Sequence, residues 1–372
     1  MRKSSFITLS LVSAFCISCS PAKDYDVELY RTVMEFHDDF KVLQLTDIHL
    51  GFQGDVNKNL KFIEASIKDA NPDLVVLTGD SFMYGNTGMV NNLFTTLNNV
   101  CNELSNKNEH ITKFAFTYGN HDNQGDYHRY YINETIKKFV TESGKEKDHK
   151  KYAAFIDFED DNLFGLTNYH IDLIDPNTKN EDPNKEDVKY RLTILDSNSY
   201  HFNGGKYGYD VIHEEQLQHA IDIYNHYDDK DYIGLAFLHI PFEEFFKARE
   251  QFLNAEDPSV FGRGEFGEGV SDPYTNNGSF DKLRSANIHA YFVGHDHINY
   301  CDLLYNATSD NVEEKAIFSY GVKSTDLIYN DENMVGYKLI NLKDGITEEE
   351  FLSVNYINGN ITNVTDRGGL YE

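Results

Sequence analysis

Cysteine is scarce in this sequence, and its scarcity excludes a fold held together by disulfides. The 372 residues contain four cysteines, and two of these, Cys16 and Cys19, lie in the first twenty residues. The remaining pair, Cys101 and Cys301, is no disulfide framework for so long a chain. Cys101 shares a helical apolar stripe with Phe94 and Leu97, so we expect a buried free thiol there.

Positive charge is also in short supply. Lysine and arginine total 33 against 61 aspartates and glutamates, which gives a formal net charge of −28. Nucleic-acid polymers and anionic membrane surfaces attract clustered basic side chains, so neither is expected as the main partner. A solvated acidic surface is the ordinary interpretation of such a balance, and a metal site would account for only a few of the carboxylates.

Long apolar runs are missing beyond the N-terminus. Residues 6–17 are apolar but too few to span a bilayer as a mature helix, and they follow Arg2 and Lys3. This pattern predicts a signal peptide over residues 1–18. Ser18 before Cys19 resembles a bacterial lipobox, although Cys16 stands where leucine is usual. We expect a lipid on Cys19 as the only membrane contact, on the outer side of a bacterial cytoplasmic membrane; simple secretion is the alternative.

The rest of the chain alternates between strand-like and helix-like segments. After a polar tether (residues 19–36), one domain is expected over residues 37–350, followed by a tail (residues 351–372). Apolar runs near residues 40–47, 74–80 and 113–122 alternate with helical periodicity over 59–73 and 90–104, the order of an α/β core. Later strands are expected at 152–158, 163–175, 190–197, 232–240, 288–295, 316–321 and 336–342, and helices at 213–227 and 279–287. Residues 254–278 lack periodicity and predict a long surface loop.

Several of the expected strands end in the same kind of polar turn. The turns are LTDIHLG with Asp47 and His49, LTGDS with Asp80, YGNHD with Asn120, His121 and Asp122, LHIP with His239, and VGHDHIN with His295 and His297. In an open α/β sheet the carboxyl ends of strands meet at one crevice, so these distant residues can gather at one edge.

The side chains in these turns suit a site for two metal ions. Carboxylates and imidazoles are ligands that zinc, manganese and iron accept. Two ions roughly 3.5–4 Å apart can stabilise both the attacking and the leaving oxygen of a phosphoryl displacement. Each motif alone also fits an ordinary role: Asp47 as a helix cap, Asp80 and GNHD as turns, His239 as a core histidine. The ordered combination of five is what favours the metal site.

The order D-x-H, G-D, G-N-H-D, H, G-H-x-H resembles that of the calcineurin-like metallophosphoesterase superfamily. The resemblance covers residues 40–345 and implies an α/β fold, a four-layer αββα sandwich of two mixed β-sheets, with a dinuclear centre of divalent transition-metal ions (Mn, Zn or Fe). It implies that Asp80 bridges the two ions. The remaining ligands would be Asp47, His49 and His297 for one ion, and Asn120, His239 and His295 for the other.

The resemblance also implies the reaction. A hydroxide bridging the metals would attack the phosphorus of a small phosphoester, phosphomonoesters being favoured, while His121 acts near the leaving group and Asp122 orients His121. The segments LDSNSY and GYDVIHEEQLQ resemble the purple-acid-phosphatase-like branch. True purple acid phosphatases place a tyrosine where this chain has Met83, so no tyrosinate-bound iron is expected. The alternatives are a phosphodiesterase or nucleotidase, and a catalytically silent surface-binding lipoprotein.

Overall fold

The structure is a computed structural model. It describes residues 27–363 except 52–53, 109, 126–127, 142–148, 156–162, 204, 310–311, 332–333 and 354–358. The expected signal peptide, the expected lipid site at Cys19 and the start of the expected tether therefore lie outside the described residues. In the part of the chain that is described, no helix combines the length and the apolar character needed to cross a membrane.

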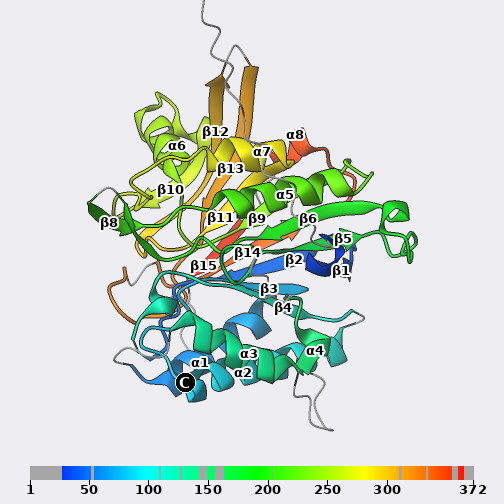
Figure 1. The fold of residues 1–372 in the computed structure, drawn as a ribbon, viewed down its shortest axis with the longest axis vertical. Helices are drawn as coiled ribbons and strands as arrows, with labels where there is room; N and C mark the ends of the chain where they lie inside the picture. The colour runs from blue at the N-terminus through cyan, green and yellow to red at the C-terminus, as the bar shows by residue number, and fades with distance from the viewer. Residues whose placement is uncertain are drawn as a thin grey trace, which may run out of the picture.

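Two mixed β-sheets lie face to face, and each has helices on its outer side (Figure 1). The eight-stranded sheet has the order β1 (Arg31–Glu35), β5 (Tyr169–Ile174), β6 (Val188–Ile194), β9 (Ile233–Phe237), β11 (Ile288–Val293), β13 (Val312–Tyr320), β12 (Asn299–Ser309), β10 (Gly262–Phe266). The five-stranded sheet has the order β15 (Gly359–Asn363), β14 (Gly336–Leu342), β2 (Phe40–Leu45), β3 (Leu74–Thr78), β4 (Lys113–Thr117). The expected four-layer αββα architecture is thus the observed one.

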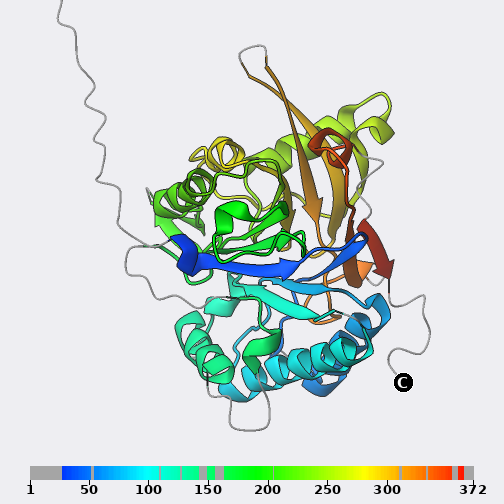
Figure 2. The same cartoon turned by 90° about the vertical axis from the view of Figure 1, so that its right-hand side faces the viewer.

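The helices divide between the outer faces of the two sheets, as Figures 1 and 2 show. The five-stranded sheet is covered by α1 (Val56–Ala70), α2 (Thr87–Lys107), α3 (Arg129–Thr141) and α4 (His149–Tyr152). The eight-stranded sheet is covered by α5 (Glu214–His226), α6 (Glu243–Asn254) and α7 (Ser279–Ser285). The remaining elements are α8 (Glu348–Phe351), the hairpin of β7 (Tyr200–Asn203) and β8 (Lys206–Tyr209), and 3-10 turns at Val27–Tyr30, His121–Asn123, Pro183–Lys185 and Pro258–Phe261.

The continuous apolar runs arise because both faces of the central strands are covered. Along β9 and just beyond it, Leu235 and Phe237 belong to the core between the sheets, whereas Ala236 and Leu238 belong to the core under α5–α7. Successive side chains of a strand point to opposite faces, so a strand buried on both sides has no polar alternation. This explains why YIGLAFLHI reads as one apolar segment.

Local capping residues set the boundaries of α1 and α2. The side chain of Asp55 accepts hydrogen bonds from the amides of Asn57 and Lys58 and so caps the start of α1, which ends at Asn71 in the left-handed conformation. On α2, Asn86 caps the first turn. Cys101 is buried in α2 and, like Cys301, is a free thiol.

The domain extends further at both ends than the sequence indicated. β1 pairs with β5 from Arg31 onward, so residues 31–35 belong to the sheet and not to the tether. β15 pairs with β14, so the expected tail contributes a strand. Both strands lie at sheet edges, where one-sided pairing leaves a weaker apolar pattern.

Two interior segments also differ from expectation. The loop expected over 254–278 contains β10, which pairs antiparallel with β12 from Gly262 to Phe266. Of the strand expected at 152–158, the described part gives the end of α4 and an isolated bridge between Phe114 and Ala153. The helices α3 and α6 and the strand β12 were also not predicted from the sequence. The strands β12 and β13 form a long ribbon that projects from the layers (Figure 2).

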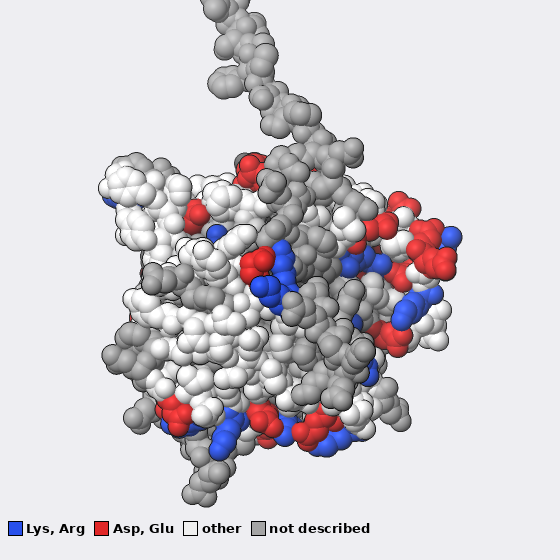
Figure 3. Space-filling view, turned by 60° about the horizontal axis from the view of Figure 1, so that its bottom comes forward, with Lys and Arg blue, Asp and Glu red and all other residues white. Residues whose placement is uncertain are grey.

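Charged side chains of both signs are mixed on the surface. In Figure 3, acidic and basic side chains lie next to one another along the lower edge of the face shown, and much of the face is uncharged. Between α1 and α2, Lys68 pairs with both Glu64 and Glu103, and Glu103 also pairs with Lys107. Such exposed pairs contribute little to stability.

The packing of α2 on the five-stranded sheet gives the first prediction. Phe94 is fully buried and its ring contacts Phe114 and Phe116 at centroid distances of 5.8 and 5.6 Å. We expect Phe94→Ala to lower the free energy of unfolding by about 3–5 kcal/mol, because it leaves a cavity in a tightly packed core. Denaturant unfolding measures this. Phe246→Ala removes the same ring at a position 46% exposed and should cost under about 1 kcal/mol; equal losses for the two variants would contradict the packing argument.

Candidate metal centre

The polar turns singled out in the sequence follow parallel strands of both sheets. β2, β3 and β4 run parallel to one another, and so do β9 and β11. Asp47 and His49 follow β2, Asp80 follows β3, Asn120 and His121 follow β4, His239 follows β9, and His295 and His297 follow β11. Since parallel strands end at the same edge, the sandwich brings these turns together where its two sheets meet.

One group of side chains consists of Asp47, His49 and His297, all buried. The Nε2 atoms of His49 and His297 are 3.0 Å apart. Oδ1 of Asp47 lies 3.7 Å from His49 Nε2 and 3.4 Å from His297 Nε2. Three donor atoms therefore converge on one point, as the ligands of a single ion do.

A second group consists of Asp80, His239 and His295. Oδ2 of Asp80 lies 3.1 Å from His239 Nε2 and 4.0 Å from His49 Nε2, which belongs to the first group. The Asp80 carboxylate thus faces both groups, which is the position of a bridging ligand. Its other oxygen, Oδ1, accepts a hydrogen bond of 2.7 Å from the amide of His121.

The two histidines of VGHDHIN separate between the groups because the chain between them is not extended. His295 has φ of 80°, in the left-handed region. Its ring packs against that of His239 at 5.1 Å, whereas the ring of His297 packs against that of His49 at 4.8 Å. Asp296, between them, points into the neighbouring core, where it accepts a hydrogen bond of 2.5 Å from the Tyr320 hydroxyl.

Backbone strain accompanies the site. The backbone angle φ lies between 50° and 80° at four residues of the site: Asp47, His49, Asp80 and His295. For a residue with a side chain, this left-handed backbone conformation carries a strain energy of about 1–3 kcal/mol. Two glycines next to these residues in space allow the turns to approach one another closely. A Cβ on Gly119 would lie 2.3 Å from Oδ1 of Asp80, and one on Gly294 would lie 2.7 Å from Oδ2 of Asp47. The glycines of GNHD and GHDH are therefore required by space.

Hydrogen bonds to the rest of the protein occupy one polar atom of the Asp47 and His239 side chains and leave the other atom facing the centre as a possible metal ligand. Asp47 Oδ2 accepts from Thr46 Oγ1 and from the amide of His295, and His239 Nδ1 donates to the carbonyl of Thr78. Five buried atoms have no hydrogen-bond partner among the described residues: Asp47 Oδ1, Asp80 Oδ2, Asn120 Oδ1, His239 Nε2 and His295 Nε2. Buried polar atoms without partners are costly, and metal ligation satisfies atoms of these types. The donor set fits two divalent transition-metal ions.

Burial and the Asp80 carboxylate give the histidines different charge states in the absence of metal. Burial lowers the pKa of His49 well below its usual value and that of His295 to about 3, so both imidazoles are neutral and keep a lone pair. Burial also disfavours charge on His239, but the adjacent Asp80 outweighs it and raises the pKa of His239 to about 9. The Asp80 carboxylate therefore attracts positive charge, which a metal ion at this place would supply.

His121 lies at the mouth of the centre and differs from the other histidines in being accessible. Its side chain is 23% exposed, and its Nε2 is 4.0 Å from Asp80 Oδ2. Asp122 does not have the expected role beside it. Its two oxygens accept hydrogen bonds from the amides of Phe82, at 2.7 Å, and Gly119, at 2.8 Å, so it joins the turns after β3 and β4. The spacing placed Asp122 next to His121 in sequence but could not show which way its carboxylate points.

Several residues that support the ligands were not singled out in the sequence. In LDSNSY, Ser197 Oγ accepts from the amide of His239, Ser199 Oγ donates to the carbonyl of Asn120, and the Tyr200 hydroxyl accepts from Asn120 Nδ2. Lys323 is buried and donates to the carbonyl of Asp47. The segment LDSNSY carries a family resemblance, but its residue types do not predict contacts with His239 and Asn120. The sequence around Lys323 likewise contains no motif that predicts its contact with Asp47.

Tyr84, one residue after Met83, is 55% exposed and lies outside both groups. Other aromatic side chains stand closer to the centre. The ring of Tyr209 packs edge-on against His295 at 4.3 Å, and the ring of Tyr329 stacks on His297 at 4.3 Å. Tyr200 stacks with Tyr209 at 5.4 Å, so the β7–β8 hairpin presents an aromatic wall beside the second group.

Comparison with known proteins gives a consistent result. A family model described as calcineurin-like phosphoesterase matches residues 40–299. The chain is similar to "Phosphatase DCR2" of Saccharomyces cerevisiae, with 27% identity over 300 residues, 76% of this chain and 47% of that protein. It is similar to "Probable inactive purple acid phosphatase 14" of Arabidopsis thaliana, with 24% identity over 330 residues, 80% of this chain and 75% of that protein. The chain thus spans about half of the yeast relative's length.

Among solved structures, the chain is similar to a dimetal phosphatase from Danio rerio. The identity is 13% and the TM-score 0.46, and the match covers 83% of this chain and 94% of that one.

The close approach at Gly119 generates a prediction. We expect Gly119→Ala to displace the Asp80 carboxylate and the His239 ring, because the added Cβ would lie 2.3 Å from Asp80 Oδ1 and 2.7 Å from His239 Cδ2. The variant should bind less metal than the unmodified chain when both are loaded with manganese or zinc and analysed by elemental mass spectrometry. Gly269→Ala is the matched control, since its Cβ would meet nothing within 4 Å. Full metal content in Gly119→Ala would contradict the geometry.

Proposed function

Since the chain belongs to the calcineurin-like phosphoesterase family, we propose that it is a metal-dependent hydrolase of phosphate esters that prefers phosphomonoesters. The observation that carries the proposal is the placement of Asp80, whose Oδ2 faces His239 at 3.1 Å and His49 at 4.0 Å. A single carboxylate shared by two groups of imidazoles is suited to two ions held close together. The relatives' names add support at the level of phosphatase chemistry.

The ions would be held by Asp47, His49 and His297 on one side and by Asn120, His239 and His295 on the other, with Asp80 between. When bound, they would neutralise charge on the phosphoryl oxygens and lower the pKa of the attacking water. The protein's own part is to hold the ligands rigidly. It does so through the amide of His121 on Asp80 and the Thr78 carbonyl on His239, at 2.7 and 2.8 Å.

His121 is proposed to act on the leaving group. It is the accessible histidine at the centre, with a side chain 23% exposed, whereas His49 and His239 are fully buried. Its backbone amide is fixed on Asp80, so its ring stands beside the centre without being needed as a ligand. From this position a ring nitrogen can donate a proton to the leaving oxygen or stabilise charge on it.

The proposed substrate is a small phosphoester, and a nucleic-acid polymer is disfavoured by the net charge of −28. The proposed site of action is outside the cytoplasmic membrane, supported by the basic start, the apolar run and Cys19 at the N-terminus. Phosphodiesterase or nucleotidase activity is the second candidate, because the same ligand arrangement serves all of these reactions. The relative named "probable inactive" makes a silent binding protein the third.

A substrate comparison tests the preference. The metal-loaded chain should hydrolyse a nitrophenyl phosphomonoester with a kcat/KM at least about tenfold above that for bis-nitrophenyl phosphate, a difference of about 1.4 kcal/mol in transition-state stabilisation. Measurements with manganese, zinc and iron guard against a metal-specific result. Faster hydrolysis of the diester with every metal would reject the monoesterase preference, and no hydrolysis despite two bound ions would favour the silent binding protein.

Two variants separate ligand from proton donor. Asp80→Ala should abolish metal loading at this centre together with activity, because it removes the oxygen that faces both groups. His121→Ala should keep the metal and lower kcat by roughly 10²–10⁴-fold, the usual contribution of a positioned acid or base. Activity assays and elemental analysis on the same samples measure both. His226 is the last residue of α5, outside the centre, so His226→Ala is the control for the loss of a histidine. An empty site in His121→Ala would show that His121 is a ligand.

A further inference from the structure

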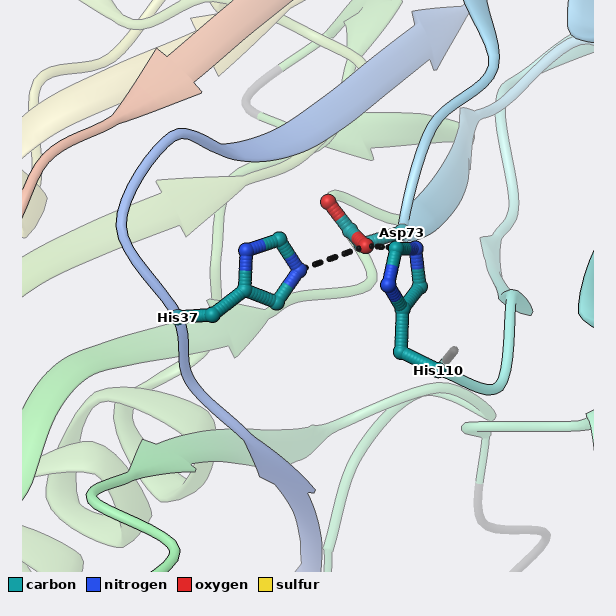
Figure 4. Close-up of side chains that lie close together, drawn as sticks. All are labelled: His37, Asp73 and His110. Atoms are coloured by element: carbon teal, nitrogen blue, oxygen red, sulfur yellow. Dashed lines mark hydrogen bonds and ion pairs between the residues drawn. The ribbon is translucent and has the colours of Figure 1, made fainter. Parts of the chain in front are cut away.

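A third group of metal-binding side chains lies away from the centre described above. His37 is in the turn between β1 and β2, Asp73 directly precedes β3, and His110 lies between α2 and β4. Figure 4 shows the two imidazoles approaching the Asp73 carboxylate from either side. Both reach the same oxygen, Asp73 Oδ1, at 2.9 Å from His37 Nε2 and 2.5 Å from His110 Nε2.

Asp73 is held firmly in this position. Its Oδ2 accepts a hydrogen bond of 2.7 Å from the amide of Lys41, and its own amide donates to the Lys41 carbonyl at 2.9 Å. Its carbonyl accepts from the amide of Lys113 at 2.9 Å. The Asp73 side chain is 4% exposed, yet those of His37 and His110 are 42% and 36% exposed, so an ion can enter from solvent. Only Oδ1 is directed at the two rings.

The orientation of His37 favours a cation between the ring and the carboxylate. Its Nδ1 lies 2.9 Å from the carbonyl oxygen of Asp38, which only accepts hydrogen bonds, so Nδ1 carries the hydrogen. In the neutral ring, Nε2 then directs a lone pair at Asp73 Oδ1, 2.9 Å away. Two facing lone pairs repel unless a proton or a metal ion lies between them, so a metal ion would replace the proton of a hydrogen bond at this place. A ring N–H on a backbone carbonyl is also the usual way in which a metal-binding histidine is oriented.

We propose that His37, Asp73 and His110 bind one divalent transition-metal ion, of which zinc is the best match to two imidazoles and a carboxylate. Three protein ligands with a fourth position open to water form a common zinc site. All three ligand atoms lie within 4.8 Å of one another, so small side-chain rotations suffice to surround an ion. The site is independent of the centre at Asp80: the two aspartates lie at opposite ends of β3, about 20 Å apart at roughly 3.3 Å per residue.

The bound ion would join three turns. His37 precedes β2, Asp73 precedes β3 and His110 precedes β4, so the ion would tie together the amino ends of the three parallel strands whose carboxyl ends carry Asp47, Asp80 and Asn120. Zinc binding at this place therefore stabilises the native fold by an amount that rises with the logarithm of the zinc concentration above the Kd, as for any ligand of the folded state. It takes no part in the hydrolysis.

Zinc counting on the full chain tests the site. After stripping with a chelator and dialysis against zinc alone, His37→Ala/His110→Ala should retain one zinc fewer per chain than the unmodified protein, by elemental mass spectrometry. His226→Ala, a histidine whose side chain is 38% exposed on α5, should retain the full number. Asp80→Ala should lose the ions of the other centre and keep this one. Equal zinc content in the double variant and the unmodified chain would overturn the proposal, whatever the state of the centre at Asp80.

Thermal unfolding distinguishes a metal site from a plain hydrogen-bonded cluster. In the Asp80→Ala chain, zinc should raise the melting temperature by several degrees, and the added His37→Ala/His110→Ala substitutions should abolish that rise. Asp73→Asn gives an independent variant, because an asparagine oxygen can still accept the Lys41 amide while the carboxylate charge is lost. If the histidine substitutions lower the melting temperature equally with and without chelator, the three residues form a hydrogen-bonded cluster only and the proposal fails.

Discussion

The structure depends on the close approach of one carboxylate, Asp80, to imidazoles supplied by both sheets. Asp80 lies at the end of β3 in the five-stranded sheet, and His239 lies at the end of β9 in the eight-stranded sheet, yet Asp80 Oδ2 and His239 Nε2 are 3.1 Å apart. Such an approach requires that the turns carry no bulk, and the position of Gly119 against Asp80 Oδ1 meets that requirement. It also requires left-handed backbone at Asp80, whose φ is 50°. The contact between Asp80 and His239 therefore joins the two sheets at this edge and also forms part of the site.

The pattern of the sequence predicted an α/β core and the polar residues at the strand ends, and the family resemblance implied the four-layer architecture. β3 and β9 read as continuous apolar runs because they are buried on both faces, and their polar turns mark where burial stops. Edge strands were missed, because β1 and β15 pair on one side only and carry a weaker apolar pattern. The strand β10 was read as loop, since three of the five residues of GRGEF are glycine or arginine and its pairing with β12 is long-range.

What the sequence could not predict is the direction of individual side chains. Asp122 adjoins His121 in the chain, but its carboxylate turns to the amides of Phe82 and Gly119. Spacing in VGHDHIN does not separate His295 from His297; the family resemblance assigned them to different ions, and the left-handed φ of 80° at His295 is what sends them to different groups. Both outcomes depend on backbone angles that residue type alone does not fix.

Hydrogen bonds from backbone amides distinguish three buried aspartates, Asp73, Asp80 and Asp122, by the number of carboxylate oxygens that no amide occupies. Asp122 uses both oxygens on amides, so it joins two turns, and it belongs to neither group of candidate ligands. Asp80 uses Oδ1 on the amide of His121 and Asp73 uses Oδ2 on the amide of Lys41, so each keeps one oxygen for the histidines around it. An aspartate with one oxygen fixed by an amide and the other facing imidazoles offers a rigidly held ligand atom. The same local chemistry therefore recurs at both ends of β3, and among Asp73, Asp80 and Asp122 the number of amides accepted separates the structural aspartate from the two candidate ligands, although all three are buried.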